Sequence, residues 1–567
     1  MPQDAFTLRY LCAELNNIFT GGKVNKIVQP SNDELILTIY TGKRTEKLLL
    51  NVNPAAPRIG VIEKESESPL TAPNFCMLMR KHLISATILG VELIGFDRIV
   101  KVDFLSSGEF FDAVKKSLYV ELMGRYSNII LTENGKILGG NRGINMFDNG
   151  VRPLIVGKDY VFPPVGEKRL PTDRELIDIF SSVTTDKIAE TITKNIQGVA
   201  SSTALEIQSE FNSKNDQNVT NFSERLYNFV QDYLFNTIKK PCVIIENDQV
   251  KDVLVYPYKT VSGDVKFFDN LHLAEEYYFT EKERAKEFNN KRERLNSITN
   301  TAIKKVKKRL TAITAKERDA LSAEENRIKG ELILANVYKF KGGETECILD
   351  NYYDGTKVKI TLDERLSAAK NAENYYKKYN KQKRTLSALA PQKEQAEKEL
   401  NYLISVLDEI NLCEDINELN LVQVELENYG LIVERKATDK KKKETTFCRE
   451  YNLFGFKVLA GRNNAENDKL TFTASGDDVW VHAKDYHSSH LIIYSNGKEI
   501  SEKVILAAAE ICAYYSKGRE GGKTEIVYTK KKYVKKPPKS KPGFCVYENF
   551  KSILVSPEKH VEFLKSE

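Results

Sequence analysis

The stretch that decides the fold is EKERAKEFNNKRERLNSITNTAIKKVKKRLTAI, residues 281–313. Its apolar residues are spaced three or four apart, at Leu295, Ile298, Ala302, Val306, Leu310 and Ile313. This spacing predicts a helix with a narrow apolar stripe, and the Lys, Arg and Glu residues between the stripe positions predict solvated flanks. The two consecutive four-residue steps from 302 to 310 indicate a stutter, which locally unwinds a supercoil. The stretch therefore favours one arm of a coiled coil.

A second stretch, residues 386–410, repeats this pattern. Its stripe consists of Leu386, Ala390, Lys393, Ala396, Leu400, Leu403, Leu407 and Ile410. Pro391 has no backbone N–H and predicts a kink or a restart of the helix. Between the arms, residues 344–349 and 357–362 read as strands around a turn at 351–355. We expect a long antiparallel coiled coil over residues 276–435 with a small β insert at 337–363.

Length and cysteine usage predict a multidomain protein of the cytoplasm, and the order of helical and strand patterns predicts its α+β class. The chain has 567 residues, enough for several domains, and a formal net charge of only +6, so local charge clusters matter more than the sum. Its eight cysteines form no CxxC pair and are expected to be reduced thiols. We find no signal peptide at the start and no apolar run of 18 residues, so no membrane is expected as a partner.

Two domains are expected before the coiled coil. Residues 1–170 combine two helical patterns with many short strands of period 2, which predict an α+β domain built on an antiparallel sandwich or barrel. Residues 171–275 are expected to form a helical domain. Within it, residues 192–200 resemble a helix–hairpin–helix, whose glycine turn offers backbone N–H groups to a phosphate. An ordinary helical turn with Gly198 at its C-cap is the alternative.

A C-terminal α+β domain is expected over residues 445–567. Strands are predicted at 456–460, 470–474, 479–483, 490–494, 525–529, 543–547 and 552–555, and a helix at 504–516. Residues 530–541 contain seven lysines. Such a cluster beside a sheet indicates binding to a phosphate backbone, with a solvated loop as the alternative.

The segment 478–490 could carry a metal site or an RNA contact. It holds His482, His487 and His490 together with two aspartates, which could be metal ligands. In a second interpretation Trp480, His482 and Tyr486 stack on RNA bases and Lys484 binds phosphate. In a third, Trp480 belongs to the core and the histidines bind nothing. We expect no metal and no cofactor.

Two further segments combine charge with a bend in the chain. Asp97 and Arg98 lie between two predicted strands, where Arg could bind a base or phosphate in a bidentate manner and Asp could accept from a base amine. A local ion pair is the alternative. Residues 121–128 place Glu121 and Arg125 on either side of a glycine bend.

An enzymatic reading rests on Pro2. If Met1 is removed, Pro2 presents a secondary amine able to form a Schiff base, as in DNA glycosylase/AP lyases of the formamidopyrimidine type. Those enzymes need an acidic residue after the proline, where this chain has Gln3, and most carry a four-cysteine zinc finger. The chain has no Walker loop, G-x-S-x-G or H-E-x-x-H motif. We therefore expect a protein that is not an enzyme.

Motifs spread over nearly the whole chain are shared with one family. They are Phe96-Asp97-Arg98, Glu121-Leu122-Met123-Gly124-Arg125, Gly330-Glu331-Leu332, Asn351-Tyr352-Tyr353-Asp354, Tyr375-Tyr376-Lys377-Lys378-Tyr379, Gly461-Arg462-Asn463-Asn464, Trp480-Val481-His482-Ala483-Lys484-Asp485, Ser489-His490 and Val534-Lys535-Lys536-Pro537. With these motifs the chain resembles the NFACT family. The family commonly has Pro-Gly before Ser-His, whereas this chain has His487-Ser488.

The resemblance implies a ribosome quality-control factor. Such a factor binds the obstructed large ribosomal subunit (rRNA and proteins) with its peptidyl-tRNA and stalled nascent chain, recruits alanyl-tRNA and directs template-independent alanine tailing. The small S4-domain protein RqcP is a further implied partner. The implied tRNA-binding residues are Asp97, Arg98, Glu121, Leu122, Met123 and Arg125. The implied RNA-binding residues of a C-terminal NFACT-R domain are Arg462, Asn463, Trp480, His482, Lys484, His490, Lys535 and Lys536. A surface fibronectin-binding adhesin, as such chains have been labelled, is the remaining alternative.

Overall fold

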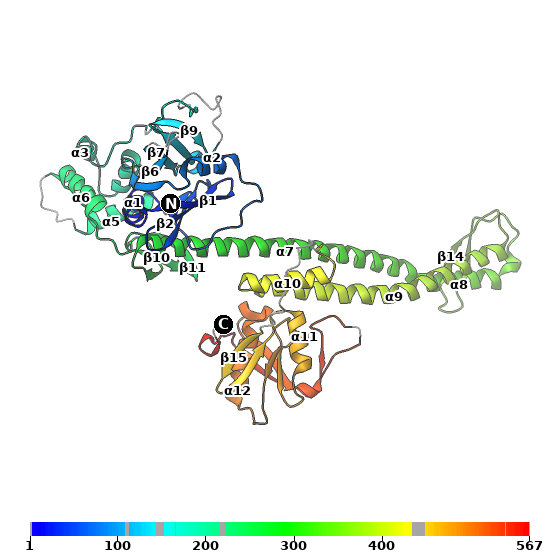
Figure 1. Cartoon of the computed structure of the whole chain (residues 1–567). Helices are drawn as coiled ribbons and strands as arrows, with labels where there is room; N and C mark the ends of the chain where they lie inside the picture. The colour runs from blue at the N-terminus through cyan, green and yellow to red at the C-terminus, as the bar shows by residue number, and fades with distance from the viewer. Residues whose placement is uncertain are drawn as a thin grey trace. The chain divides into compact units, whose positions relative to one another are not determined.

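The computed structural model is a mixed helix-and-sheet protein that divides into two compact units, Met1–Ala285 and Lys286–Glu567 (Figure 1). The structure describes residues 3–107, 113–142, 152, 154–164, 166–214, 221–433, 448–538 and 540–565. Pro2 lies outside these residues, and the four predicted domain ranges stay predictions. Within the described residues, no helix is both long enough and apolar enough to cross a membrane.

The main sheet of the first unit is antiparallel, with nine strands in the described residues in the order β4-β3-β2-β1-β5-β6-β7-β8-β9. The strands are β1 (Lys23–Ser31), β2 (Glu34–Tyr40), β3 (Thr45–Asn51), β4 (Arg58–Val61), β5 (Thr87–Leu93), β6 (Ile99–Ser107), β7 (Ala113–Glu121), β8 (Asn128–Glu133) and β9 (Lys136–Gly140). The expected sandwich or barrel is therefore wrong. Alternating strands specify one buried face, and here helices rather than a second sheet cover it.

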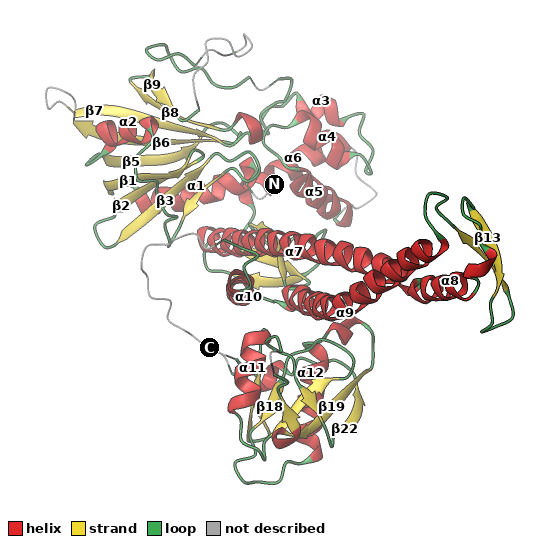
Figure 2. Ribbon diagram, turned by 90° about the vertical axis from the view of Figure 1, so that its right-hand side faces the viewer, coloured by secondary structure: helices red, strands yellow, loops and turns green. Residues whose placement is uncertain are grey.

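Helices supply the second layer of this unit (Figure 2). They are α1 (Ala5–Phe19), α2 (Asn74–Leu83), α3 (Leu176–Phe180), α4 (Ile188–Asn195), α5 (Ser201–Ser213) and α6 (Phe222–Asn236). A small sheet that the sequence analysis missed follows them, in the order β11-β10-β12. Its strands are β10 (Cys242–Glu246), β11 (Gln249–Leu254) and β12 (Asp264–Phe267).

The helical pair of the second unit confirms the predicted antiparallel coiled coil. Helix α7 (Leu271–Leu321) runs beside α9 (Ala368–Leu412), and α8 (Ala323–Ala335) and α10 (Ile416–Asn428) extend the pair. The antiparallel register is seen in the contacts Asn296–Asn411, Arg309–Glu399 and Glu317–Lys393. Of the kink or helix restart predicted at Pro391, the restart is wrong, because α9 continues through this residue, and the kink stays a prediction.

The stripe is offset from the prediction by one residue at several positions. Thr299 and Ile303 are buried, while Ile298 and Ala302 are half-buried. On α9, Leu389 is buried and Ala390 is exposed. The local twist of the pair decides between adjacent positions, and a pattern of spacings alone does not specify that twist.

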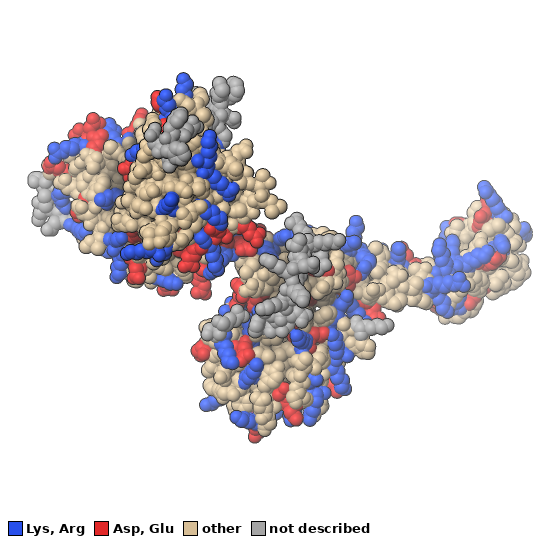
Figure 3. Space-filling model, in the orientation of Figure 1, with Lys and Arg blue, Asp and Glu red and all other residues tan. Residues whose placement is uncertain are grey.

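The β insert is a two-stranded hairpin at one end of the helical pair, as predicted (Figure 2). Its strands are β13 (Glu346–Asp350) and β14 (Lys357–Thr361), and the turn is closed by the Gly355 N–H donating to the Asn351 carbonyl at 2.8 Å. Figure 3 shows Lys and Arg side chains gathered over this end. The exposed lysines there include Lys357, Lys359, Lys377, Lys378 and Lys381.

The C-terminal part of the second unit has a six-stranded sheet, in the order β15-β16-β18-β17-β19-β22, and a separate pair β20-β21. The strands are β15 (Arg449–Leu453), β16 (Phe456–Ala460), β17 (Val479–Ala483), β18 (Leu491–Ile493), β19 (Thr524–Lys530), β20 (Val534–Lys535), β21 (Val546–Tyr547) and β22 (Lys551–Val555). The helices are α11 (Asn464–Thr473) and α12 (Glu502–Tyr514). The strand predicted at 470–474 is wrong: it is the end of α11, which Asn463 caps.

Candidate nucleic-acid interface

The turn between β5 and β6 carries the first candidate pair. Phe96 is buried and packs on Phe235 with ring centroids 5.6 Å apart, which fixes the turn to the helical layer. Asp97 Oδ1 accepts a hydrogen bond from the Arg98 N–H at 2.7 Å. The Arg98 carbonyl accepts from the Leu122 N–H at 2.8 Å, which joins this turn to the chain after β7. Asp97 and Arg98 are half-buried.

Asp97, Arg98 and Met123 line a groove of about 650 Å³ in the first unit. The other lining residues are Asp4, Tyr126, Pro164, Lys168, Thr193, Gln197, Gly198, Val199, Ala200, Ser201, Ser202 and Asp252. The sequence predicts separate domains for the Asp-Arg turn and the hairpin. The structure brings both to one concave surface.

The hairpin between α4 and α5 forms the second wall of the groove. Gly198 has a φ of +68°, which a glycine adopts without strain. Asp4 caps α1 by accepting from the Thr7 N–H at 2.9 Å, and its other oxygen accepts from the Ala200 N–H at 3.1 Å and the Thr203 hydroxyl at 2.8 Å. A carboxylate of the chain thus already binds the inner side of the α5 N-terminus. The outer residues of this terminus, Ser201 and Ser202, remain on the groove wall.

Glu121 supports the groove without lining it. Its carboxylate is buried and accepts from both Arg152 guanidinium nitrogens, at 2.6 and 3.0 Å, and from the Tyr160 hydroxyl at 2.8 Å. Leu122 beside it is buried in the core. Both residues therefore hold the Met123 segment in place, and neither offers its side chain to the groove.

Arg125 lies just outside the groove lining. It is exposed within a short 3₁₀ turn, Gly124–Tyr126, and its guanidinium lies 4.7 Å from the Tyr126 ring centroid. Its carbonyl accepts from Arg142 Nη1 at 2.7 Å, which fixes the backbone of the turn. Arg125 is not among the residues that line the groove.

The aromatic cluster of residues 480–490 is part of a core. Trp480 is fully buried, stacks on His482 with centroids 5.3 Å apart and meets His490 edge-on. Burial, together with nearby His487, lowers the pKa of His482 to about 4, and burial also lowers that of His490 well below its usual range. Both rings are therefore neutral at pH 7. Trp480 presents no face for base stacking in this arrangement, which favours the core interpretation.

The remaining C-terminal candidates divide into two sets. Arg462, His482 and His490 line a small polar cavity in the second unit. Arg462 forms an ion pair with Glu466 at 2.8 Å, while Asn463 is buried as the cap of α11.

The candidate lysines are instead on the surface. Lys484 forms an ion pair with Glu525 at 3.0 Å, and Lys535 lies 3.8 Å from a Glu548 oxygen. Lys536 forms an ion pair with Asp468. The structure thus does not bring these lysines to the cavity that holds Arg462.

Sequence reasoning missed several residues of the groove, among them Lys168 and Ser201, and it noted Gln197 only as part of the hairpin. Gln197 bonds the Lys168 carbonyl at 2.9 Å, so the chain after the proline pair 163–164 is fastened to the hairpin. The glycine turn at 198 was the one available signal. Nothing local marks Lys168, because only the tertiary fold places it beside Arg98.

Comparisons with known proteins cover nearly the whole chain. A family model described as the NFACT N-terminal and middle domains matches residues 4–445, and one described as the NFACT protein RNA binding domain matches residues 445–545. The chain is 31% identical over 559 residues to "Rqc2 homolog RqcH" of Bacillus subtilis, covering 96% of each chain. It is 30% identical over 571 residues to the protein of the same name from Streptococcus pneumoniae, covering 98% of each.

More distant similarities are also found. The human "Ribosome quality control complex subunit NEMF" is 32% identical over 126 residues, which cover 22% of this chain and 11% of that protein. Among solved structures, the N-terminal part of the fibronectin/fibrinogen-binding protein from Streptococcus suis is 26% identical with a TM-score of 0.43, covering 49% of this chain and 98% of that one. Because the family models and the full-length relatives agree, we conclude that this chain belongs to the NFACT family.

Proposed function

We propose that this chain is a cytoplasmic ribosome quality-control factor. It binds the large ribosomal subunit that still carries a stalled nascent chain on peptidyl-tRNA, recruits alanyl-tRNA and directs template-independent addition of alanine to the C-terminus of that chain. The observation that carries the proposal is the end-to-end similarity to proteins named RqcH, with an RNA-binding domain model over residues 445–545. The small S4-domain protein RqcP is a proposed assisting partner.

The groove of the first unit is the proposed tRNA site. Arg98 and Lys168 supply positive charge, Asp97 can accept from a base amine, and Ser201 and Ser202 offer donors at a helix N-terminus. The groove is large enough, and has enough lining residues, to hold a nucleotide with its phosphates rather than a single ion. Contacts of this kind give both phosphate binding and base discrimination.

In this proposal the chain is not an enzyme. Ribosomal RNA catalyses peptide bond formation. The protein accelerates tailing by holding alanyl-tRNA near the peptidyl-tRNA, so that the two reactants are already positioned when they react. The exposed lysines at the hairpin end of the helical pair and around Lys535 supply further contacts to rRNA phosphates.

The direct test is to sequence the RNA that co-purifies with the tagged full-length chain and to follow the chain through a sucrose gradient. We expect alanine tRNA to be enriched and the protein to migrate with large subunits. A Schiff base trapped by borohydride on abasic DNA would favour the Pro2 lyase instead. Recovery of the chain at the cell surface would favour the adhesin.

A further inference from the structure

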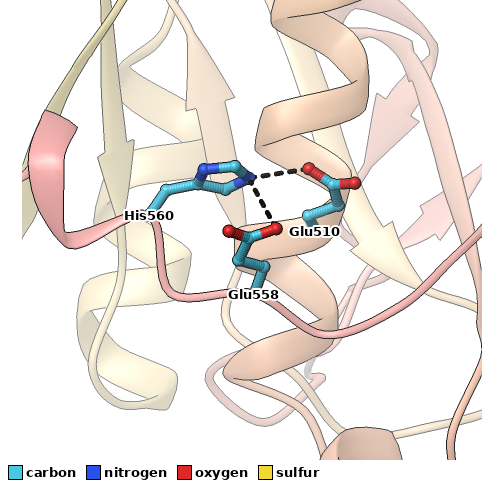
Figure 4. Close-up of side chains that lie close together, drawn as sticks. All are labelled: Glu510, Glu558 and His560. Atoms are coloured by element: carbon cyan, nitrogen blue, oxygen red, sulfur yellow. Dashed lines mark hydrogen bonds and ion pairs between the residues drawn. The ribbon is translucent and has the colours of Figure 1, made fainter.

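A second chemical cluster lies in the C-terminal part of the second unit, away from the residues discussed so far. Glu510 belongs to α12, while Glu558 and His560 belong to the segment that follows β22 (Figure 4). One ligand atom from each of the three, an imidazole nitrogen or a carboxylate oxygen, lies within 4.8 Å of the other two. This segment was not singled out by the sequence, because Glu510 is 48 positions or more from its partners.

The cluster is organised around His560 Nε2. This nitrogen lies 2.7 Å from Glu510 Oε2 and 3.8 Å from Glu558 Oε2. The backbone adds a fixed point, since the Glu558 N–H donates to the Glu510 carbonyl at 3.2 Å. The His560 and Glu510 side chains are 12% and 21% exposed, so both are held by the fold, whereas Glu558 is 62% exposed.

The other ring nitrogen is held by a carboxylate outside the cluster. His560 Nδ1 lies 3.0 Å from Glu562 Oε1. A carboxylate that accepts from Nδ1–H leaves Nε2 as the nitrogen that binds a metal ion once it releases the proton shared with Glu510, and metal-binding histidines have this arrangement. The orientation of the ring therefore fits Nε2 as a ligand.

The charge of the cluster also favours a bound cation. Three carboxylates surround one imidazole, so the group keeps a net negative charge even when the imidazole is protonated. The nearest lysine in sequence, Lys559, does not balance it, because its ammonium pairs with Glu414 at 2.8 Å. The group thus attracts a cation, either a proton or a metal ion.

We propose that Glu510, Glu558 and His560 bind one divalent zinc ion, with water as the fourth ligand. Glu562 orients the imidazole by accepting a hydrogen bond from its Nδ1–H. An imidazole nitrogen with two carboxylates is a donor set that suits Zn²⁺ better than Mg²⁺ or Ca²⁺. Zinc ligands in a tetrahedron are roughly 3.3 Å apart at ordinary bond lengths. The Nε2–Glu558 distance of 3.8 Å and the Nε2–Glu510 distance of 2.7 Å lie about half an ångström above and below that spacing. The ion would fasten the C-terminal segment to α12, whatever RNA the chain binds.

The test is equilibrium dialysis of the chelator-treated full-length chain against zinc chloride at pH 7.5, with bound metal counted by mass spectrometry. We expect one tightly bound zinc per chain, a loss of that zinc in His560→Gln, and at least a tenfold weaker affinity in Glu558→Gln. Glu558 is largely exposed, so its change cannot unfold the domain. Glu499→Gln, an exposed carboxylate of the same domain, is the matched control and should bind as the unmodified chain does.

Cobalt distinguishes this site from the eight thiols of the chain. Co²⁺ bound by imidazole and carboxylates gives d–d bands without sulfur-to-metal charge transfer, and we expect such a spectrum, lost in His560→Gln. Binding should also weaken between pH 7.5 and 5.5, since a proton competes for Nε2. Zinc stoichiometry unchanged in both His560→Gln and Glu558→Gln, a thiolate spectrum, or no tightly bound zinc would overturn the proposal.

Discussion

Gly198 of the hairpin lies directly against the carbonyl of Phe96. A Cβ built on Gly198 would be 2.3 Å from that carbonyl oxygen and 2.3 Å from the Ala5 Cβ. The two walls of the groove are therefore joined at a point where only a glycine fits. Through this contact, the Asp97–Arg98 turn and the α5 N-terminus keep a fixed separation.

We predict that Gly198→Ala lowers the free energy of unfolding by at least about 2 kcal/mol, because it adds a steric clash to the strain of a left-handed backbone. Gly135→Ala is the control, since Gly135 has a φ of +81° but no neighbour within 4 Å of its added Cβ. It should cost about 1 kcal/mol from the backbone alone. Urea unfolding of the two variants measures the difference. Equal costs would show that the Gly198–Phe96 contact is not tight.

The buried pair of Glu121 and Arg152 gives a second prediction. Arg152→Met leaves the Glu121 carboxylate buried without its cation, and we expect a loss of about 3 to 5 kcal/mol in stability. The solvent-screened pair Arg169–Glu175 is the comparison, and Arg169→Met should cost far less stability. Chemical denaturation of both variants measures this. A small effect at Arg152 would mean that Glu121 is solvated.

Glu275 near the start of α7 predicts a pH dependence of stability. Its carboxyl is buried and accepts from Gln3 Nε2 at 2.7 Å, and burial raises its pKa to about 8. The folded state therefore holds a proton that the unfolded state releases near pH 4.5, so stability falls as pH rises from about 5 to 8. This group alone contributes a slope of about 1.4 kcal/mol per pH unit.

Glu275→Gln should remove that slope, because its amide does not titrate. The amide oxygen can still accept the hydrogen bond from Gln3. Denaturation of the full chain and the variant at pH 6 and pH 9 gives the comparison, with the variant gaining stability relative to the native chain at pH 9. Parallel pH profiles would contradict a protonated Glu275.

Glu14, whose carboxylate accepts from the Leu271 and His272 N–H groups, shows the opposite behaviour: burial raises its pKa, but His272, Lys239 and these N–H groups lower it to about 2.

An ion pair between Arg449 of β15 and Glu418 of α10 gives a prediction within the second unit. Their side chains are 11% and 5% exposed, and the Arg449 guanidinium lies 3.9 Å from the Tyr515 ring centroid. Glu418→Ala should cost about 3 to 5 kcal/mol and increase hydrogen exchange in β15. The pair of Glu450 and Lys565, whose side chains are 29% and 62% exposed, is the control, and Glu450→Ala should change exchange much less. Equal exchange in both variants would contradict the structural role of Glu418.

The success of sequence reasoning differed between the periodic and the compact parts of the chain. The helical pair and its hairpin were predictable because spacing alone specifies an amphipathic helix and a strand turn. Residues 470–474 were not, since their short apolar run fits a strand as well as the buried end of α11. Trp480 shows the limit at the site: its sequence context suits both stacking and core, and only tertiary packing decides.

The groove had the same limit. Asp97 and Arg98 could be chosen from their turn, and Gly198 from its hairpin, but their common surface depends on a long-range fit. Lys168 had no local signal at all. The carboxylate of Asp4, which occupies the inner side of the α5 N-terminus, also has no sequence pattern that would reveal it.

The affinity of the full-length chain for alanine tRNA, measured by filter binding at fixed salt for Arg98→Ala and Arg44→Ala, tests the central claim most directly. Arg44 is the matched control, an arginine 70% exposed in the turn between β2 and β3. We predict that Arg98→Ala weakens binding roughly tenfold or more while Arg44→Ala binds like the native chain. Equal affinities for the native chain and Arg98→Ala, with both folded, would contradict the assignment of the groove as the tRNA site.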